Sequence, residues 1–251
     1  MAEIIILSII QGLTEFLPVS SSAHLILISK YFNFANENLN LDLSLHLGSL
    51  LAIVIYFKKD LFDFINNKNL LLKILLSSVP TLITGALLVK FHLIAYLRNY
   101  EIIGWTTILF GALLYISDLK KEKKSIRKDF RYSTALYIGF FQILSLIPGV
   151  SRSGITITAG RFFNFKRLDS AKISFLLSIP TLAAVSLYNF NNLLTKQDLE
   201  ISLLNFLGIF LSFIFSYITI KFFLEFIKKF SLLYFVIYRL ILGSLILVYV
   251  Y

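Results

Sequence analysis

Two short stretches of this chain carry polar residues in patterns that could do chemistry. The first is QGLTEFLPVSSSAH, residues 11–24. Gln11 and Glu15 are four residues apart, so on a helix their side chains share one face. Pro18 disfavours helix at the residue before it and allows a new helix to begin afterwards. The stretch therefore predicts one helix that ends near a carboxylate and a second helix that follows the break.

The serines after this break could begin the second helix and could also act as nucleophiles. Ser20 or Ser21 suits the N-cap position, where a hydroxyl accepts a hydrogen bond from a free backbone N–H group. His24 lies three residues beyond Ser21 and falls on the same helical face. Because a serine attacks well only when a neighbouring base takes its proton, the spacing favours Ser21 as nucleophile and His24 as base. Attack by His24 itself, or by water acting under Glu15, stays open.

The second stretch is PGVSRSGIT, residues 148–156, and its residue types suit an anion. The proline–glycine pair interrupts the chain, and Ser151 or Ser153 can cap the helix that follows. Free N–H groups at a helix N-terminus attract anions, and Arg152 adds a planar set of donors that matches phosphate oxygens in pairs. The residues predicted to bind a phosphate group are Ser20, Ser151, Arg152, Ser153, Thr156 and Gln11.

A carboxylate beside a phosphate site needs a cation next to it or a role as a base. Mg²⁺ in proteins takes one or two carboxylates together with phosphate oxygens and water. Glu15 is therefore the predicted ligand of a divalent cation, Mg²⁺ in the first place and Ca²⁺ as the alternative. The predicted catalytic set is Ser21, His24, Glu15 and Arg152.

The elements that position these residues must lie in lipid. Of the 251 residues, 57% are hydrophobic and only 15% are charged, with a mean hydropathy of +0.81, whereas soluble domains keep about a quarter of their residues charged. The net charge of +10 comes from lysines and arginines in short loops, which favours anionic lipid headgroups over nucleic acid as partners. The absence of cysteine excludes disulfides and thiolate metal sites.

Six apolar runs could cross a bilayer as helices if their ends are drawn loosely. They are residues 42–57, 73–92, 101–117, 168–188, 201–226 and 232–251. Segments 1–30 and 133–165 are also apolar, but proline, glycine and serine interrupt them. We interpret the chain as an all-α polytopic membrane protein with about six transmembrane helices and two re-entrant helical hairpins. Charged groups at mid-membrane usually mark function, whereas His46 is assigned to helix packing.

Lysines and arginines alternate between the loops in a way that predicts an orientation. They are concentrated in residues 58–73, 119–131 and 161–172 and at Lys228 and Lys229, and they are scarce in the loops between. Because cytoplasmic loops carry an excess of these residues, the basic loops are predicted inside and both termini outside. The alternation holds if each interrupted segment enters and leaves the membrane on the same side.

The two interrupted segments match each other at a fixed offset of 131 residues. The matched pairs include Gln11 with Gln142, Ser20 with Ser151 and Ser22 with Ser153. With three spans in each half, the halves are inverted relative to each other, which brings two discontinuous hairpins together near the midplane. The chain is thus predicted to be a single membrane domain, 1–251, with repeats at about 1–118 and 133–251 joined by a basic loop, 119–132.

At these two motifs the chain closely resembles the bacterial undecaprenyl-diphosphatase family, the bacitracin-resistance membrane phosphatases. The family's first motif, an acidic helix leading into a proline–serine–histidine segment, is matched by residues 11–24. Its second motif, PGxSRSxxT, is matched by residues 148–156. The first position of the family's acidic pair is often Glu and here is Gln11, which leaves Glu15 as the one carboxylate of the pair.

The resemblance implies hydrolysis of undecaprenyl diphosphate to undecaprenyl phosphate and inorganic phosphate, with a divalent metal. This reaction recycles the lipid carrier for cell-wall peptidoglycan synthesis and confers bacitracin resistance. The resemblance also implies the bacterial cytoplasmic membrane, with the active site facing its outer side.

Other functions fit parts of the same pattern. Inverted repeats with interrupted helices also occur in transporters, so a flippase that moves a polyprenyl phosphate across the membrane is the alternative. A non-catalytic lipid-binding scaffold is a third interpretation, and it would tolerate the loss of Ser21 and His24. The sequence leaves open the nucleophile, the preferred metal, the prenyl chain length, whether the chain forms a homodimer and whether it also moves lipid.

Overall fold

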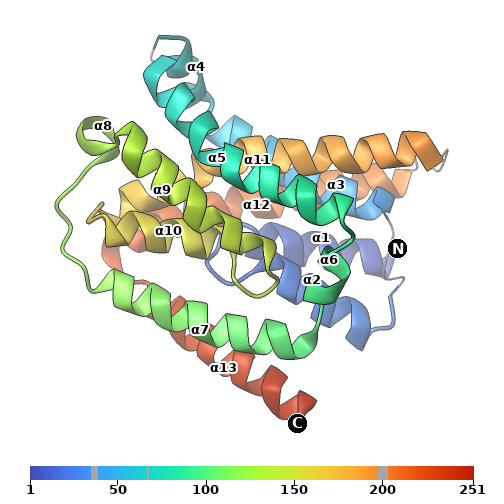
Figure 1. Ribbon diagram of the computed structural model, residues 1–251. Coiled ribbons are helices and arrows are strands. Elements are labelled where there is room, and N and C mark those ends of the chain that lie inside the picture. The colour runs from blue at the N-terminus through green and yellow to red at the C-terminus, as the bar shows by residue number, and fades with distance from the viewer. Residues whose placement is uncertain (35–38, 67, 197–202) are drawn as a thin grey trace.

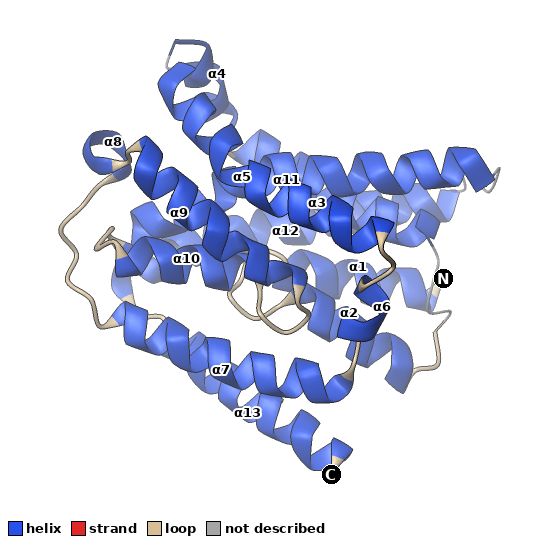
Figure 2. Cartoon of the chain, in the orientation of Figure 1, coloured by secondary structure: helices blue, strands red, loops and turns tan. Residues whose placement is uncertain are grey.

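Helices make up every named element in the part of the chain that the structure describes. The computed structural model describes residues 1–34, 39–66, 68–196 and 203–251 (Figure 1). Figure 2 shows these helices joined by turns and loops, with no strand among the described residues. The predicted all-α class is confirmed.

The long helices coincide with the predicted spans. They are α3 (Leu39–Tyr56), α5 (Lys68–Lys90), α7 (Tyr100–Asp118), α11 (Arg167–Lys196), α12 (Leu203–Lys229) and α13 (Leu233–Val250). All of these except α3 are long and apolar enough to cross a membrane. The apolar part of α3, Leu41–Tyr56, is shorter than a usual span, and this helix packs along α12. The prediction of a polytopic membrane protein is therefore confirmed, with five helices of full spanning length among the described residues.

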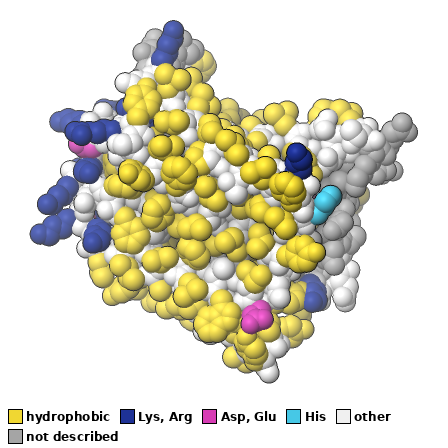
Figure 3. Space-filling model, viewed as in Figure 1, with side chains coloured by type: hydrophobic (Ala, Val, Ile, Leu, Met, Phe, Trp, Pro, Cys, Tyr) yellow, Lys and Arg dark blue, Asp and Glu magenta, His cyan; other side chains and the backbone are white. Residues whose placement is uncertain are grey.

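The surface of the protein suits lipid. Figure 3 shows hydrophobic side chains over most of the visible face, and lysines and arginines gather at the end that carries α4 and α8. The short connecting helices are α4 (Lys58–Asn66), α6 (Ile94–Leu97) and α8 (Ile126–Asp129). So much exposed apolar surface would cause aggregation in water. The large apolar side chains exposed along the spans include Leu87, Leu109, Phe210 and Leu245.

The two interrupted segments form helical hairpins. The first consists of α1 (Ala2–Thr14) and α2 (Ser21–Tyr31). The second consists of α9 (Tyr132–Ile143), a 3-10 turn (Leu144–Leu146) and α10 (Arg152–Phe162). The longest of these helices has 13 residues and rises about 20 Å, which is less than the ~30 Å of a hydrocarbon core. Each helix is therefore too short to cross by itself, in agreement with the re-entrant interpretation.

The two breaks share their local geometry. Ser20 and Ser151, which the offset of 131 pairs in sequence, are the N-cap residues of α2 and α10, and both adopt a positive φ, 74° and 71°. Their hydroxyls contact those of Ser22 at 3.2 Å and Ser153 at 3.1 Å, respectively. A positive φ is costly for a residue with a side chain. Its occurrence at two matched serines indicates that both breaks are the same structural motif.

Small residues allow α3 and α12 to pack closely. A side chain at Gly48 would collide with the backbone of Ile209. The hydroxyl of Ser49 lies 3.2 Å from that of Ser212 and 3.0 Å from that of Ser216. Small residues and hydroxyl bonds are the usual means by which helices associate in lipid. Because α1 packs against the same helix, α12, this contact also fixes the position of the first hairpin.

Asp118, the last residue of α7, joins the ends of several helices. Its carboxylate accepts hydrogen bonds from Arg167 (Nε, 2.6 Å; Nη2, 3.1 Å) and from the backbone N–H of Leu232 (3.0 Å). Arg161, near the end of α10, lies 3.6 Å from the same carboxylate and donates to three backbone carbonyls. Arg161 is completely buried, so it is not one of the exposed loop charges among which the sequence places it. It fixes the far end of α10.

Candidate active site

Glu15 and Arg152 meet where the breaks of the two hairpins come together. Glu15 directly follows α1, and Arg152 is the first residue of α10. The Nη2 atom of Arg152 donates to Oε1 of Glu15 at 2.8 Å, and the two side chains are only 12% and 8% exposed. Removing one member of such a buried pair leaves an uncompensated charge, which is strongly destabilising. The structure thus brings together the predicted carboxylate and the predicted phosphate-binding arginine.

The guanidinium of Arg152 is held on its other side as well. Its Nη1 atom donates to the carbonyl oxygen of Ser174 on α11 at 3.2 Å, and its centre lies 5.9 Å from the ring centre of Phe16. The Thr156 hydroxyl donates to the Arg152 carbonyl at 2.8 Å and lies 2.7 Å from Ser174 Oγ. Thr156 is completely buried. Its hydroxyl therefore supports Arg152 from behind, whereas the sequence predicted that it would face the phosphate.

Ser21 is bonded to the same carboxylate as Arg152. Its Oγ atom donates to Oε2 of Glu15 at 2.6 Å, and Nε2 of Gln11 donates to the same oxygen at 3.1 Å. Ser21 is half-buried and its neighbour Ser22 is exposed, so Ser21 lies close to the surface of the protein. Glu15 is therefore the proton acceptor closest to the predicted nucleophile.

His24 has other partners than the sequence predicted. Its Nδ1 atom donates to the carbonyl oxygen of Ser20 at 2.7 Å, and its Nε2 atom lies 2.5 Å from the hydroxyl of Tyr238 on α13. The two rings stack with centres 5.7 Å apart. No hydrogen bond joins Ser21 to His24, although the structure describes both residues. The first turn of α2 explains this. The Ser20 carbonyl accepts the hydrogen bond from Nδ1, and this bond orients the ring toward Tyr238 on α13.

The predicted phosphate-binding serines hold the two breaks against each other. Ser20 Oγ accepts from the backbone N–H of Gly149 at 3.2 Å, and Ser153 Oγ donates to the carbonyl of Leu17 at 2.7 Å. Ser151 Oγ caps α10 by accepting from the N–H of Gly154 at 3.1 Å. Each serine thus has a structural partner in the resting protein, and two of the three bonds cross from one hairpin to the other.

Arg239 on α13 is a residue of the site that sequence reasoning missed. It is completely buried, and it donates only to backbone carbonyls among the described residues. These carbonyls belong to both breaks and to α7, and the residues are Pro18, Gly149, Val150, Thr106 and Thr107. An arginine inside the apolar run 232–251 is the signal that could have identified it, because a charge within a span is costly and seldom incidental.

A divalent cation fits the donors around Glu15. Oε1 of Gln11 is buried and has no hydrogen-bond partner, while Nε2 of the same amide donates to Glu15. A buried amide oxygen without a partner is costly, and a cation beside it would satisfy it. The described residues contain no group of three His, Cys, Asp or Glu that could hold a metal alone. One carboxylate and one amide oxygen are ligands of the kind that Mg²⁺ accepts, and phosphate oxygens and water would have to supply the others.

Comparisons with known proteins show the family to which the chain belongs. The family described as Bacitracin resistance protein BacA matches residues 4–245. The chain belongs to this family. It is 51% identical to the undecaprenyl-diphosphatase of Pelagibacter ubique over 99% of this chain and 97% of that protein. It is 40% identical to the undecaprenyl-diphosphatase 1 of Pseudoalteromonas translucida, over 96% of this chain and 95% of that protein.

A further relative has the same name and a similar degree of identity. The undecaprenyl-diphosphatase of Saccharophagus degradans is 40% identical over 96% of this chain and 94% of its own length. These relatives and the apolar helices together establish a multi-pass bacterial membrane protein. Glu15 and Arg152 both lie within the residues that match the BacA family.

Proposed function

We propose that this chain is an undecaprenyl-diphosphatase, an enzyme that hydrolyses undecaprenyl diphosphate to undecaprenyl phosphate and inorganic phosphate. Its main support is the buried contact between Glu15 and Arg152, with Ser21 bonded to the same carboxylate. In this proposal Arg152 binds the phosphate, Ser21 is the nucleophile and Glu15 is the proton acceptor. All three meet at the N-terminus of α10. The names of the relatives point to the lipid diphosphate as substrate.

Substrate binding begins with an exchange of partners at Arg152. In the resting protein its Nη2 atom neutralises Glu15, while Nη1 stays on the Ser174 carbonyl. A diphosphate that enters at the N-terminus of α10 offers the guanidinium a partner with more than one negative charge and a matching paired geometry. The free N–H groups of the first turn of α10 favour the same anion. Arg152 then stabilises the charge that develops on the phosphoryl oxygens in the transition state.

Ser21 carries out the first chemical step. When Arg152 turns to the terminal phosphate, it leaves Oε1 of Glu15, which would then be free to bind a divalent cation. The other carboxylate oxygen, Oε2, takes the proton of Ser21, to which it is already bonded at 2.6 Å. Ser21 Oγ forms a bond to the terminal phosphorus, and the bond from that phosphorus to the bridging oxygen breaks. Undecaprenyl phosphate leaves with the bridging oxygen, and Ser21 carries the phosphoryl group.

His24 serves the second step. Because its Nδ1–H donates to the Ser20 carbonyl, the lone pair of the neutral ring lies on Nε2, beside Tyr238 at the exposed side of the site. There it takes a proton from the water that attacks the phosphoserine, and the P–O bond to Ser21 breaks to release inorganic phosphate. Glu15 returns its proton to Ser21, and His24 passes the proton from the water to the departing phosphate, which together restore the resting enzyme.

A divalent cation is part of the proposal. Glu15 and the unpartnered Oε1 of Gln11 would hold it. When bound, such a cation neutralises charge on the phosphate oxygens. The carboxylate of Glu15 would then lie next to an anionic substrate without repelling it.

The site faces the outer side of the cytoplasmic membrane in this proposal. Figure 3 shows lysines and arginines gathered at the end of the molecule that carries α4 and α8, and Figure 1 shows both termini away from that end. Because basic loops stay in the cytoplasm, this distribution supports termini outside. The first hairpin begins near the N-terminus, so its break and the exposed Ser22 are approached from the same side. There the enzyme recycles the carrier lipid for cell-wall synthesis.

Phosphate release by the purified protein tests the function. Wild-type protein in detergent should release inorganic phosphate from undecaprenyl diphosphate, and a chelator should stop the release. Diphosphates with shorter prenyl tails, assayed in parallel, define the chain-length preference. If the protein instead moves polyprenyl phosphate between the leaflets of a vesicle and releases no phosphate from any diphosphate, it is a transporter with the same architecture.

A further inference from the structure

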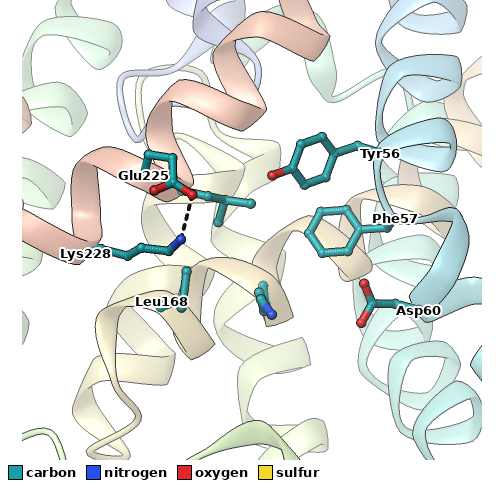
Figure 4. Close-up of a pocket in the computed structure, with 8 residues that line it drawn as sticks. Tyr56, Phe57, Asp60, Leu168, Glu225 and Lys228 are labelled. Carbon is teal, nitrogen blue, oxygen red and sulfur yellow. Dashed lines mark hydrogen bonds and ion pairs between the residues drawn. The ribbon is translucent and has the colours of Figure 1, made fainter.

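A pocket lies away from the active site, at the end of the molecule where the lysines gather. It has a volume of about 200 Å³ and lies where α3 ends, α11 begins and α12 ends (Figure 4). None of its lining residues belongs to the active site described above. They are Tyr56, Phe57, Asp60, Leu168, Lys172, Leu224, Glu225 and Lys228.

The pocket combines an apolar floor with a charged rim. Phe57 and Leu224 are only 2% and 4% exposed. Figure 4 shows Glu225 and Lys228 on one side, joined by an ion pair of 2.6 Å, and Asp60 on the other side below Phe57. A ligand that fits must therefore have a small apolar part against the floor and charged groups of both signs at the rim.

The rim charges are balanced, and two of the four form an ion pair with each other. Two ammonium groups, Lys172 and Lys228, face two carboxylates, Asp60 and Glu225. Glu225 and Lys228 pair with each other. No ion pair joins Asp60 or Lys172 to another side chain within the described ranges. An unpaired carboxylate and an unpaired ammonium in one pocket complement a ligand that carries both an anionic and a cationic group.

The surroundings of the pocket favour a membrane lipid over a soluble zwitterion. Ile218, Phe222 and Glu225 lie on one face of α12 by helical spacing. Ile218 and Phe222 are 53% and 56% exposed, so an apolar stripe leads from the rim along the span. A headgroup in the pocket would therefore have its acyl chains on this stripe, in the hydrocarbon layer where they belong.

We propose that this pocket binds the headgroup of a zwitterionic phospholipid of the phosphatidylethanolamine type. The phosphate lies at Lys172, the primary ammonium lies at Asp60, and the glycerol backbone covers Leu168, while Glu225 and Lys228 keep their ion pair. Phosphatidylglycerol has the same phosphate but no ammonium, so it would leave Asp60 unpaired beside an anion. The site does not depend on the hydrolase activity.

The pocket is also connected to the active site through α11. Lys172 lies two residues before Ser174, whose carbonyl holds Arg152 at 3.2 Å. A headgroup bound to Lys172 would therefore restrain the part of α11 that positions the phosphate-binding arginine. Binding is nevertheless the primary measurement, because it can be read with no substrate present.

Native mass spectrometry of the full chain in detergent tests the site. The probes are dimyristoyl phosphatidylethanolamine and dimyristoyl phosphatidylglycerol, added separately at equal concentration. Wild-type protein should retain the first lipid more strongly. Asp60→Asn and Lys172→Gln should each weaken its retention about fivefold, since one charged contact at a membrane surface contributes on the order of 1 kcal/mol.

Lys229→Gln is the matched control, because Lys229 neighbours Lys228 but does not line the pocket. It should retain phosphatidylethanolamine as the wild type does. Lys172→Arg, which keeps the charge, should also retain it and shows that a loss in Lys172→Gln is not a folding defect. The proposal is overturned if the wild type binds phosphatidylglycerol equally or better, if Asp60→Asn has no effect, or if Lys229→Gln loses as much as Lys172→Gln.

Discussion

Replacing Arg152 with lysine keeps the positive charge and removes the planar set of donors. In the structure, Arg152 uses Nη2 for Glu15 and Nη1 for the Ser174 carbonyl, so two atoms on one rigid group face two partners at once. A lysine has a single nitrogen and cannot hold the Ser174 carbonyl and a phosphate oxygen in the same way. Removing one hydrogen-bond donor that stabilises the charge of the transition state raises the activation free energy by about 2.7–4 kcal/mol. The kcat should therefore fall by a factor of about 10² to 10³.

The assay is the initial rate of phosphate release from undecaprenyl diphosphate at saturating substrate and Mg²⁺, with kcat and KM fitted separately. Arg131→Lys, an exposed arginine before α9, is the matched control and should behave as wild type. Comparable folding is checked by the thermal unfolding midpoint in the same detergent. A kcat for Arg152→Lys within about threefold of wild type would remove Arg152 from the chemistry and refute the reasoning.

Ser21→Ala removes the group bonded to Glu15, so turnover should fall by at least about 10³ and acid quenching should trap no phosphoserine; near-normal turnover would exclude attack by Ser21. Arg239→Met leaves several buried carbonyls without a donor and should lower the free energy of unfolding by about 3 kcal/mol or more, and an unchanged Tm would contradict that role. Gln11→Leu should raise the Mg²⁺ concentration needed for half-maximal rate about tenfold, whereas an unchanged requirement would separate Gln11 from the cation.

The arrangement of helices could be predicted from the sequence because lipid imposes strong constraints. Apolar runs of sufficient length become helices, and a proline or glycine with serines inside such a run marks a break. The boundaries were less predictable. The α11 helix continues to Lys196, beyond the predicted end at residue 188, because the polar residues that follow the apolar run can extend a helix out of the hydrocarbon layer.

The contact between Glu15 and Arg152 could be anticipated from the matched breaks, but the hydrogen bonds around them could not. Spacing places Ser21 and His24 on one face of a helix, but it does not reveal that the imidazole of His24 is hydrogen-bonded to the Ser20 carbonyl. Arg239 was missed because its partners are backbone carbonyls from three distant segments. Backbone groups carry no signature in the sequence, so only the folded chain shows where they converge.

The most direct measurement of the central claim is an experimental structure of the protein with a non-hydrolysable methylene diphosphonate analogue of the substrate and Mg²⁺. The terminal phosphonate should lie at the N-terminus of α10 within hydrogen-bond distance of Arg152, with the guanidinium turned away from Glu15 and Ser21 Oγ facing the phosphorus. A phosphonate bound elsewhere, with the pair of Glu15 and Arg152 still intact, would contradict it.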